Sequence, residues 1–507
     1  MITQFSDITK NLEIDCDVCV IGSGAGGAPL AKELAEAGRK VVIIEEGSHY
    51  STKDFNVNDT VISTSRLYRD AGATVIFGKP NVMLAEGRCL GGSTTINGGM
   101  CWRTPEKIMK RWQWERGLQD FTPEKMDKFF SRVEKTIKAN PILPEARNRD
   151  SELLKMGAEA LGYKVKANIR AQDKCVGANQ CLTGCPTEAK QSMLSGYIPQ
   201  FLAAGGDIFT NCRVKRVLTR GKRAVGIEGV FVDPMTKRST HRLRVQAKTV
   251  VVSGGAIQTP ALLLRSGIRD EAGLLGRNLL VHPNAKVLAV FEEPVNAWHG
   301  VNQGFQITEF FDEGIIMAVN FTPPGIVALA LPIEGTQTLR TMKNEFHNLI
   351  MGAALIEDTG SGRVRAGPFD TVIPTYQLND HDFRQTIRAV ALLCEVFFAA
   401  GAKKCYLPFS TFTEIRSVDD IPKIYNHQFR KIDLELMTVH IMGTAQMGSN
   451  PSNSVINQFG EFHNVKGLFV SDASVFPTSI GVNPQITIMA LATRTAAYMV
   501  DNFGNYL

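Results

Sequence analysis

The chain reads CDVCVIGSGAGGAPLAKELAEAGRKVVIIE over residues 16–45, and this stretch decides the fold. It opens with the apolar run CDVCVI, whose valine and isoleucine content is typical of a buried parallel strand. A glycine-rich turn follows at 22–27, then an alanine-rich amphipathic segment to Ala37, a helix stop at Gly38 and the apolar strand VVIIE. Strand, helix and strand in this order predict a β-α-β unit.

Each glycine of the turn has a task in such a unit. Gly22 allows the tight turn, Gly24 lets the backbone approach a pyrophosphate, and Gly27 permits close packing of the helix on the strand. The amides at the helix N-terminus then face the phosphates. Glu45 ends the second strand and is placed to accept hydrogen bonds from a ribose. The pattern predicts a bound dinucleotide without distinguishing FAD from NAD.

A second part of the same domain is predicted at residues 211–256. Segments 214–219, 224–232 and 242–245 read as strands separated by turns, and they lead into the apolar strand 249–252. A β-meander that returns to a parallel strand is consistent with a flavoprotein dinucleotide domain interrupted by other material.

The remaining segments differ in character and predict a second domain. Residues 112–200 are more helical, whereas 283–430 mix extended runs with helices. The expected fold class is α/β, a Rossmann-type dinucleotide domain with a parallel sheet and a β-meander, plus an α+β substrate-binding domain, with their segments interleaved in sequence. We assign 14–111, 200–282 and 455–507 to the first domain, and 112–199 and 283–454 to the second.

Composition and charge exclude several classes of protein. The 507 residues are 44% hydrophobic and 21% charged, which is ordinary for a globular chain. A net charge of +6 is too small and dispersed to indicate nucleic-acid binding. The densest basic run, 213–223, alternates with valine and leucine and reads as a solvated strand face. No nucleic-acid partner is expected.

The sequence was also searched for the patterns of signal peptides and membrane helices. Residues 1–13 are polar and charged, unlike a signal peptide. The charge-free stretches 314–333 and 473–493 are interrupted by asparagine and proline, which argues against membrane helices. We therefore expect no transmembrane segment, a cytoplasmic location and mostly reduced cysteines.

Further motifs carry a family resemblance. The chain contains EGRCLGGSTTINGG at 86–99, GAIQTPALLLRSGI at 255–268, and a C-terminal block with VHIMGT at 439–444, FVSDASVFP at 469–477 and GVNP at 481–484. With the glycine turn, these motifs resemble the glucose-methanol-choline (GMC) oxidoreductases, in the right order from Asp17 to about Met499. The GVNP segment looks like that of cholesterol oxidases and long-chain alcohol oxidases. Arg269 replaces a glycine of the usual second motif, which leaves a local turn in doubt.

The resemblance implies FAD as cofactor and an alcohol as substrate. A flavin alcohol oxidoreductase needs a base beside flavin N5, and histidine suits this task because its ordinary pKa is about 6.5. His440 occupies the position of the family's active-site histidine, and Asn483 that of its hydrogen-bonding partner. His440 is expected to accept the proton while hydride moves to the flavin, and Asn483 to fix the substrate oxygen. Without the resemblance, a core histidine and a helix N-cap asparagine are the simpler interpretations.

The flavin contacts are carried over by position. Pro484 precedes an apolar helix-like run at 486–500, whose positively polarised start is expected to face the flavin. Taken singly, Gly91, Gly92 and Gly98 fit plain turn glycines equally well. The predicted cofactor-binding residues are Gly22, Ser23, Gly24, Ala25, Gly27, Glu45, Gly92, Ser93, Asn97, Gly98, Val214, Asp472, Ala473 and Pro484.

Three clustered cysteines leave two interpretations open. Cys175, Cys181 and Cys185 lie in CVGANQCLTGCP, and three sulfurs need a further ligand to complete a four-cysteine site. The spacing resembles that of flavin-dependent sugar dehydrogenases whose large subunit holds an iron-sulfur cluster. The loop also looks like that of relatives for which no cluster is implied, where a reduced, packed loop is expected.

These observations predict an FAD-dependent oxidoreductase that acts on the CH–OH group of an alcohol, by hydride transfer to flavin N5. The apolar stretch 325–333 fits a hydrophobic pocket, and with it a fairly apolar substrate, long-chain or sterol-like, but it fits a piece of the core as well. The second partner is oxygen or an electron acceptor such as a cytochrome. One alternative is the large subunit of a flavin and iron-sulfur sugar dehydrogenase. Another is a non-redox flavin lyase of the hydroxynitrile lyase type. An NAD-linked dehydrogenase is disfavoured because the C-terminal block has no role in it.

Overall fold

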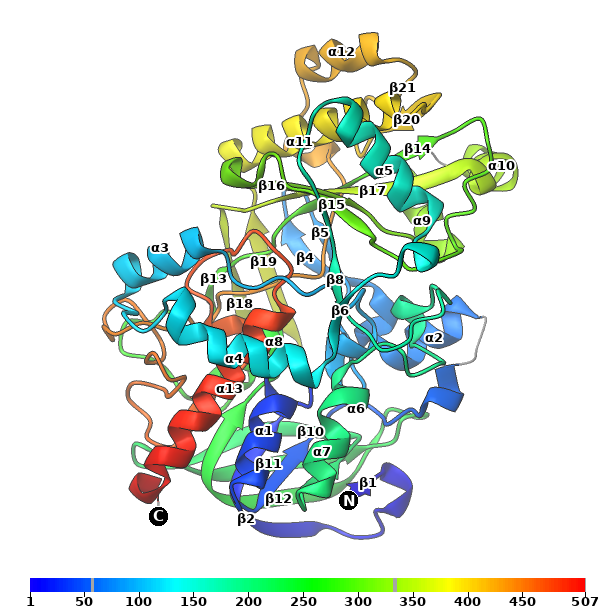
Figure 1. The fold of residues 1–507 in the computed structure, drawn as a ribbon. Helices are drawn as coiled ribbons and strands as arrows, with labels where there is room; N and C mark the ends of the chain where they lie inside the picture. The colour runs from blue at the N-terminus through cyan, green and yellow to red at the C-terminus, as the bar shows by residue number, and fades with distance from the viewer. Residues whose placement is uncertain (56–58, 332–334, 507) are drawn as a thin grey trace.

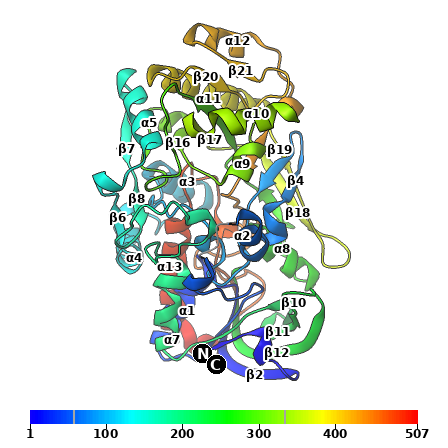
Figure 2. The ribbon, with the colours of Figure 1, turned by 90° about the vertical axis from the view of Figure 1, so that its right-hand side faces the viewer.

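The computed structural model describes residues 1–55, 59–331 and 335–506. Two sheets organise these residues, one in the lower and one in the upper half of the molecule (Figure 1). Seen from the side, both chain ends lie at the base of the lower half (Figure 2). This arrangement is the α/β fold with interleaved segments that the sequence predicted.

The first sheet is a parallel sheet extended by an antiparallel meander. Parallel pairing joins β1 to β9, β9 to β3, β3 to β2 and β2 to β12, while β10, β11 and β12 form the meander. The strands run in the order β1 (Ile2–Thr3), β9 (Asp207–Phe209), β3 (Val41–Ile44), β2 (Leu12–Ile21), β12 (Ser239–Val252), β11 (Arg223–Val232) and β10 (Cys212–Arg220), and β23 (Leu468–Val470) also pairs with β12.

The strand β12 is continuous where the sequence predicted two strands. Its first half pairs antiparallel with β11, and its second half pairs parallel with β23, while β2 lies alongside both halves. The chain therefore changes partners without a break, which local sequence patterns do not reveal.

Helices bury the faces of this sheet. The helix α1 (Gly27–Glu36) follows the glycine turn and packs beside α13 (Gln485–Asn502), whose other flank contacts α4 (Pro123–Thr136) (Figure 1). The buried alanine and leucine side chains of α1 cover β3, which is buried throughout, and the second half of β2, which is buried from Val18 to Ile21. This packing fixes the start of α1 at the carboxyl end of β2.

The second sheet is mixed and longer. In order its strands are β13 (Arg277–Leu279), β18 (Ser361–Ala366), β19 (Val372–Gln377), β4 (Thr74–Gly78), β5 (Val82–Leu84), β22 (Leu436–Thr438), β14 (Asn284–Val290), β17 (Leu349–Ile356), β16 (Ile315–Val319), β15 (Phe305–Ile307) and β7 (Val165–Ala167). Strand β20 (Lys404–Tyr406) pairs with β14 and with β21 (Glu414–Ile415), and β6 (Ala139–Pro141) pairs with β8 (Ile169–Ala171).

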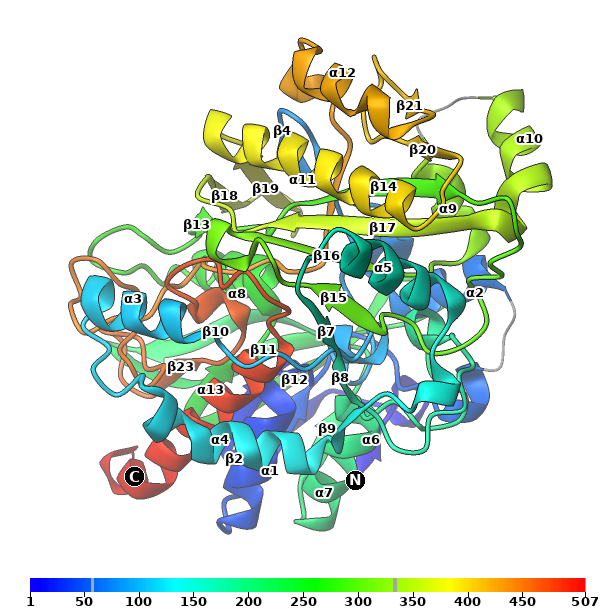
Figure 3. The same ribbon diagram turned by 45° about the horizontal axis from the view of Figure 1, so that its top comes forward.

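Helices α5 (Arg149–Ala160) and α11 (Asp380–Ala399) cover the outer face of this sheet (Figure 3). Alternate residues of β14, including Ala285 and Val287, belong to the core that these helices close. The intervening residues, such as Asn284 and Lys286, therefore point to the inner face, toward the first sheet. The remaining helices are α2 (Thr60–Leu67), α3 (Glu106–Arg116), α6 (Met193–Gly196), α7 (Ile198–Ala203), α8 (Gly255–Arg265), α9 (Pro324–Leu329), α10 (Thr336–Glu345) and α12 (Ile421–Asn426).

The chain crosses between the two halves more often than the predicted domain bounds suggest. Helix α4, which we placed in the substrate-binding domain, packs on α13. Strands β4 and β5, which we placed in the dinucleotide domain, pair within the second sheet. The division into two domains with those bounds stays a proposal. Among residues 1–55, 59–331 and 335–506, no helix is long and apolar enough to span a bilayer.

Candidate active site

A cavity of about 520 Å³ opens at the carboxyl ends of three parallel strands. Strands β3, β2 and β12 end at Ile44, Ile21 and Val252, and all three residues line it. The chain leaves β2 toward β3 on one side while β12 lies on the other, and such a switch point is where open α/β sheets bind ligands. The predicted cofactor residues in its lining are Gly22, Ser23, Gly24, Ala25, Glu45, Gly92, Ser93, Val214, Asp472, Ala473 and Pro484.

The glycines of the turn divide into two kinds. At Gly22 the backbone has φ +99°, and a Cβ would lie 2.4 Å from the Ser253 carbonyl oxygen. At Gly27 a Cβ would lie 1.9 Å from the Gly22 oxygen, so both positions are required by packing. A Cβ on Gly24 would meet only the Gly92 Cα, at 4.0 Å. The two backbones at Gly24 and Gly92 thus form an open cradle in the cavity wall.

Glu45 is buried and ties the turn to the end of β3. Its carboxylate accepts hydrogen bonds from the Ser23 backbone N–H at 3.0 Å, the Ser23 hydroxyl at 2.6 Å and the Gly47 N–H at 2.7 Å. Burial raises the pKa of Glu45, and these three donors oppose the rise. A carboxylate has about four acceptor positions. One therefore stays open toward the cavity for a further donor.

Asp472 closes the opposite wall of the cavity. It accepts hydrogen bonds from the Gly255 N–H at 2.9 Å, the Thr259 hydroxyl at 2.5 Å and the Ser474 N–H at 2.8 Å. Burial raises its pKa against the effect of these donors. The carboxylate holds the start of α8 against the loop that leads to α13.

The start of α13 faces the cavity. Pro484 is the N-cap residue, no side chain caps the helix, and both Pro484 and Ile488 line the cavity. The Asn483 amide nitrogen lies instead 3.2 Å from Nε2 of His440. The helix dipole directs partial positive charge toward the space beside Pro484.

Three predicted residues pack around the cavity without lining it. Gly27 supports the turn as described. The Asn97 side chain donates to the Gln485 amide oxygen at 2.8 Å and accepts from the Gly99 N–H at 2.9 Å. A Cβ on Gly98 would lie 1.8 Å from Oε1 of Gln303. Asn97 and Gly98 thus join the first sheet's loops to α13 and to the second sheet.

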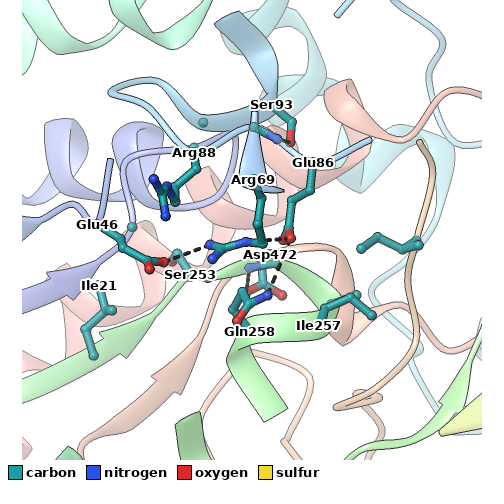
Figure 4. A pocket seen from close by; sticks show the side chains of 18 of the residues that line it. Ile21, Glu46, Arg69, Glu86, Arg88, Ser93, Ser253, Ile257, Gln258 and Asp472 are labelled. Carbon is teal, nitrogen blue, oxygen red and sulfur yellow. Dashed lines mark hydrogen bonds and ion pairs between the residues drawn. The ribbon is translucent and has the colours of Figure 1, made fainter. Parts of the chain in front are cut away.

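A chain of partly buried ion pairs in the cavity wall was missed by sequence reasoning. Arg69 contacts Glu46 at 2.8 Å and Glu86 at 2.9 Å (Figure 4). Arg213 also contacts Glu46, at 2.9 Å. Burial raises the pKa of Glu46, but the positive charge of Arg69, and after it that of Arg213, outweighs this effect and lowers the pKa to about 2. Arg213 belongs to the basic run that we interpreted as a solvated strand face. Its alternation with apolar residues did not indicate that its side chain enters the cavity wall.

His440 forms the centre of a polar group beside the cavity. Its Nε2 lies 3.2 Å from the Asn483 amide nitrogen, so the two predicted residues are brought together. Its Nδ1 lies 3.0 Å from Nδ1 of His282, and the two imidazoles stack with centroids 5.1 Å apart. Val439 and Ile441, on either side of His440, line the cavity. His282 directly precedes the Pro283 that leads into β14, and nothing local in the sequence singled it out.

The histidine pair constrains where the protons sit. Two facing Nδ1 atoms need one donor and one acceptor, so they share one proton. When Nδ1 of His440 is the donor, its Nε2 keeps a lone pair on the side of Asn483. His282 then carries its single ring N–H proton on Nε2, which is buried without a partner among the described residues.

Burial and nearby charge keep both rings neutral. Burial, and after it the positive charges of His282 and Lys286, hold the pKa of His440 well below its usual range. Burial lowers the pKa of His282 to about 4. At neutral pH the pair is therefore a neutral donor and acceptor, which leaves His440 ready to accept a proton.

The three clustered cysteines do not assemble a metal centre. Cys181 accepts a hydrogen bond from the buried Arg170 guanidinium at 3.2 Å, and Cys185 accepts from the Lys190 N–H at 3.4 Å. Within the part of the chain that the structure describes, no group of three or more His, Cys, Asp or Glu side chains can hold a metal ion. The cysteine spacing resembled that of proteins with an iron-sulfur cluster, but among the described residues the three side chains are not grouped as metal ligands.

Comparison with protein families identifies three matching regions. Models described as GMC oxidoreductase match residues 64–284 and residues 359–492, and a model described as FAD binding domain matches residues 17–54. The matched regions include the glycine turn, Glu45, His440 and Asn483.

Several relatives extend over nearly the whole chain. An uncharacterized GMC-type oxidoreductase of Mycobacterium tuberculosis is 34% identical over 95% of this chain and 75% of its own length. One of Sinorhizobium fredii is 33% identical over 96% of this chain and 95% of its own. A long-chain-alcohol oxidase of Arabidopsis thaliana is 26% identical over 97% of this chain and 69% of its own length.

Solved structures share the fold at low identity. Pyridoxine 4-oxidase from Mesorbium loti superposes with a TM-score of 0.70 at 16% identity and covers 95% of this chain and 99% of its own. Formate oxidase from Aspergillus oryzae gives a TM-score of 0.72 at 15% identity, with 99% and 100% covered. Both likenesses concern the arrangement of elements.

Proposed function

The chain belongs to the GMC oxidoreductase family, and from this premise we propose that it oxidises the CH–OH group of an alcohol to a carbonyl, with FAD as hydride acceptor. The observation that carries the proposal is the contact of His440 with both Asn483 and His282 at the edge of the cavity. An unprotonated imidazole nitrogen and an amide N–H beside it are the two groups that alcohol activation needs.

The cavity suits FAD. The glycine cradle at Gly24 and Gly92 leaves room for a pyrophosphate at the start of α1, where helix amides favour negative charge. Glu45 retains an acceptor position for a ribose hydroxyl. Bound FAD supplies the acceptor for the hydride that leaves the alcohol carbon, at flavin N5.

The chain's own residues handle the proton. His440 accepts the hydroxyl proton at Nε2 while the carbon–oxygen bond becomes a carbonyl and hydride leaves the carbon. The low pKa of His440 keeps that nitrogen unprotonated before the reaction. Asn483 donates an amide N–H to the substrate oxygen, which stabilises the negative charge that develops there. His282 holds the imidazole of His440 in the required tautomer.

Two substrate classes have separate support. The likeness to Arabidopsis long-chain-alcohol oxidases favours a long-chain or sterol-like alcohol. The apolar stretch 325–333, on which the sequence-based prediction depended, gives no support, because Val327 and Leu331 pack into a core cluster with Leu288 and Tyr406. Residues 332–333 lie outside the described part of the chain. The polar inner face of the second sheet favours a more polar alcohol, as developed below.

The test is anaerobic reduction of the bound flavin. Protein purified with FAD is mixed without oxygen with decan-1-ol, a sterol and a panel of polar alcohols, and the flavin absorbance is followed. We expect bleaching with at least one alcohol and formation of the matching carbonyl. Reoxidation by oxygen, compared with an artificial acceptor, then separates an oxidase from a dehydrogenase. Bound flavin that no alcohol bleaches would overturn the proposal and favour a lyase.

A further inference from the structure

A buried lysine lies close to the histidine pair. Lys286 is on β14, four residues after His282, and its side chain faces the inner side of the second sheet. Its charge is among the causes that lower the pKa of His440, so the two groups are within electrostatic reach. The exposed fraction is 7% for Lys286 and 8% for Asn284, against 0% for Ala285 between them. Lys286 and Asn284 on the inner face are thus buried but keep a small accessible area, while Ala285 on the outer face keeps none.

The ammonium group of Lys286 is solvated by amides and has no counterion. It donates to the Asn320 side-chain oxygen at 2.8 Å. With its amide oxygen turned toward the lysine, Asn284 accepts a second hydrogen bond at 3.1 Å. Among the described residues no carboxylate oxygen lies within 4.0 Å of Nζ. Lysines are almost never buried unless they are paired, and burial lowers the pKa of this one to about 7.

The neighbours of the lysine in its row across the sheet have small side chains. Lys286 on β14 pairs with Ala353 on β17. In the same row, Ala353 pairs with Ala318 on β16, and Ala318 pairs with Gln306 on β15. Residues opposite each other point to the same face, so two alanines separate a lysine from a glutamine. The Gln306 side-chain oxygen is buried and has no hydrogen-bond partner within the described residues. An apolar substrate against this face would leave such groups unpaired, which is unfavourable.

We propose that Lys286 binds an anionic group, a carboxylate above all, carried by the alcohol substrate a few carbons from its reacting CH–OH. Asn284 and Asn320 hold the ammonium in place for this contact. The inference depends on the proposed function, because it narrows the substrate class of the same site. An anion beside Lys286 supplies the missing counterion and favours the charged amine. A cation of this kind orients the substrate so that its hydroxyl reaches His440.

The first experiment measures selectivity with matched alcohols. The FAD-loaded wild type, K286M and K286R are compared. Each is assayed with two carboxylates, 3-hydroxypropionate and 4-(hydroxymethyl)benzoate, and with the neutral primary amide of each. A third pair, sn-glycerol 3-phosphate and glycerol, tests a phosphate in place of a carboxylate. For at least one pair, we expect the wild type to prefer the anion by about 10-fold or more in kcat/KM. K286M should lower that preference by about 10- to 100-fold, mainly through KM, and K286R should restore part of it.

A binding measurement avoids dependence on turnover. Benzoate, which lacks a hydroxyl, is titrated into the FAD-loaded proteins and followed by the change in the flavin spectrum. We expect the wild type to bind benzoate about 10-fold or more tightly than K286M, and benzamide to bind both weakly. K166M is the matched control, because Lys166 is an exposed lysine at the far end of the same row, opposite Gln306. Retained FAD and an unchanged Tm in K286M show that the variant folds.

The outcomes separate the two proposals. Equal kcat/KM for every anion and its neutral partner would overturn the role of Lys286, even when alcohols bleach the flavin. An equal loss on anionic and neutral alcohols in K286M would do the same. Preference for decan-1-ol over all anionic alcohols would assign the site to long-chain substrates. If no alcohol bleaches the flavin while benzoate binding depends on Lys286, the oxidation proposal fails and the anion site survives.

Discussion

In the proposed mechanism, removal of the hydroxyl proton depends on the imidazole of His440. We expect His440→Ala to keep FAD bound, because the side chain stands beside the cavity lining, and to slow anaerobic flavin reduction about 100-fold or more. His241→Ala, at a half-buried histidine of β12, is the control. Stopped-flow absorbance measures both variants. Reduction of the H440A flavin at the wild-type rate would remove His440 from the mechanism.

The charges around His440 determine the pH below which flavin reduction slows, that is, the acid limb of the pH–rate profile. Its pKa is lowered, so the base stays neutral below the ordinary histidine range of about 6.5, and flavin reduction should stay fast there. Lys286→Met removes a positive charge, which raises the pKa of His440 and moves the acid limb to higher pH. The rate constant of reduction by a neutral alcohol, measured as a function of pH, checks this. A limb that stays in place or moves to lower pH would contradict it.

His282 is a positioning residue whose replacement can be chosen by backbone geometry. Its φ is +45°, a left-handed conformation that asparagine tolerates better than most residues. We expect His282→Asn to keep an acceptor for Nδ1 of His440 and to reduce the flavin faster than His282→Ala. In H282A the loss should fall on the rate constant of reduction, by about 10-fold, and not on alcohol affinity. Equal rates in the two variants would count against a tautomer-fixing role.

At the scale of elements, the glycine turn separates folding from cofactor binding. Gly22→Ala places a Cβ 2.4 Å from the Ser253 carbonyl at φ +99°, so it should lower the Tm of the protein. Gly24→Ala meets no protein atom closer than 4.0 Å, so its methyl group should enter the cofactor cradle instead. We expect G24A to fold with a Tm near that of the wild type and to bind FAD more weakly. Flavin content and thermal unfolding measure the two effects.

The elements that could be predicted are those with local signals. The strand, glycine turn and helix at 16–38 were confirmed because turn residues and hydrophobic period specify them without distant contacts. The strand β12 was wrongly divided, since its continuity depends on which strands pair with it. A periodicity within one segment does not carry that information.

The site shows the same division between local and distant information. His440 and Asn483 were placed by family motifs, and the structure brings them to 3.2 Å. His282 lies 158 positions from His440 in sequence, and Lys286 reaches the same place only through the register of β14. Their partners are fixed by sheet pairing, so no pattern around either residue indicated a role.

At the scale of the whole molecule, two sheets face each other across the proposed reaction site. The first sheet presents the cavity at the ends of β2, β3 and β12. The second sheet supplies His282 and Lys286 from β14 and its N-terminal approach, and the chain after β22 supplies His440. The sequence predicted two interleaved domains, but it did not predict that β4 and β5 join the second sheet. The proposed reaction therefore draws on residues from both halves.

The most direct test of the central claim is the anaerobic bleaching of the FAD-loaded protein by an alcohol labelled with deuterium on its carbinol carbon. Hydride transfer from that carbon, with His440 as proton acceptor, predicts that the flavin is bleached and that the deuterated alcohol bleaches it more slowly than the unlabelled one. Bleaching at the same rate with both alcohols, or no bleaching by any alcohol, would contradict the proposed oxidation.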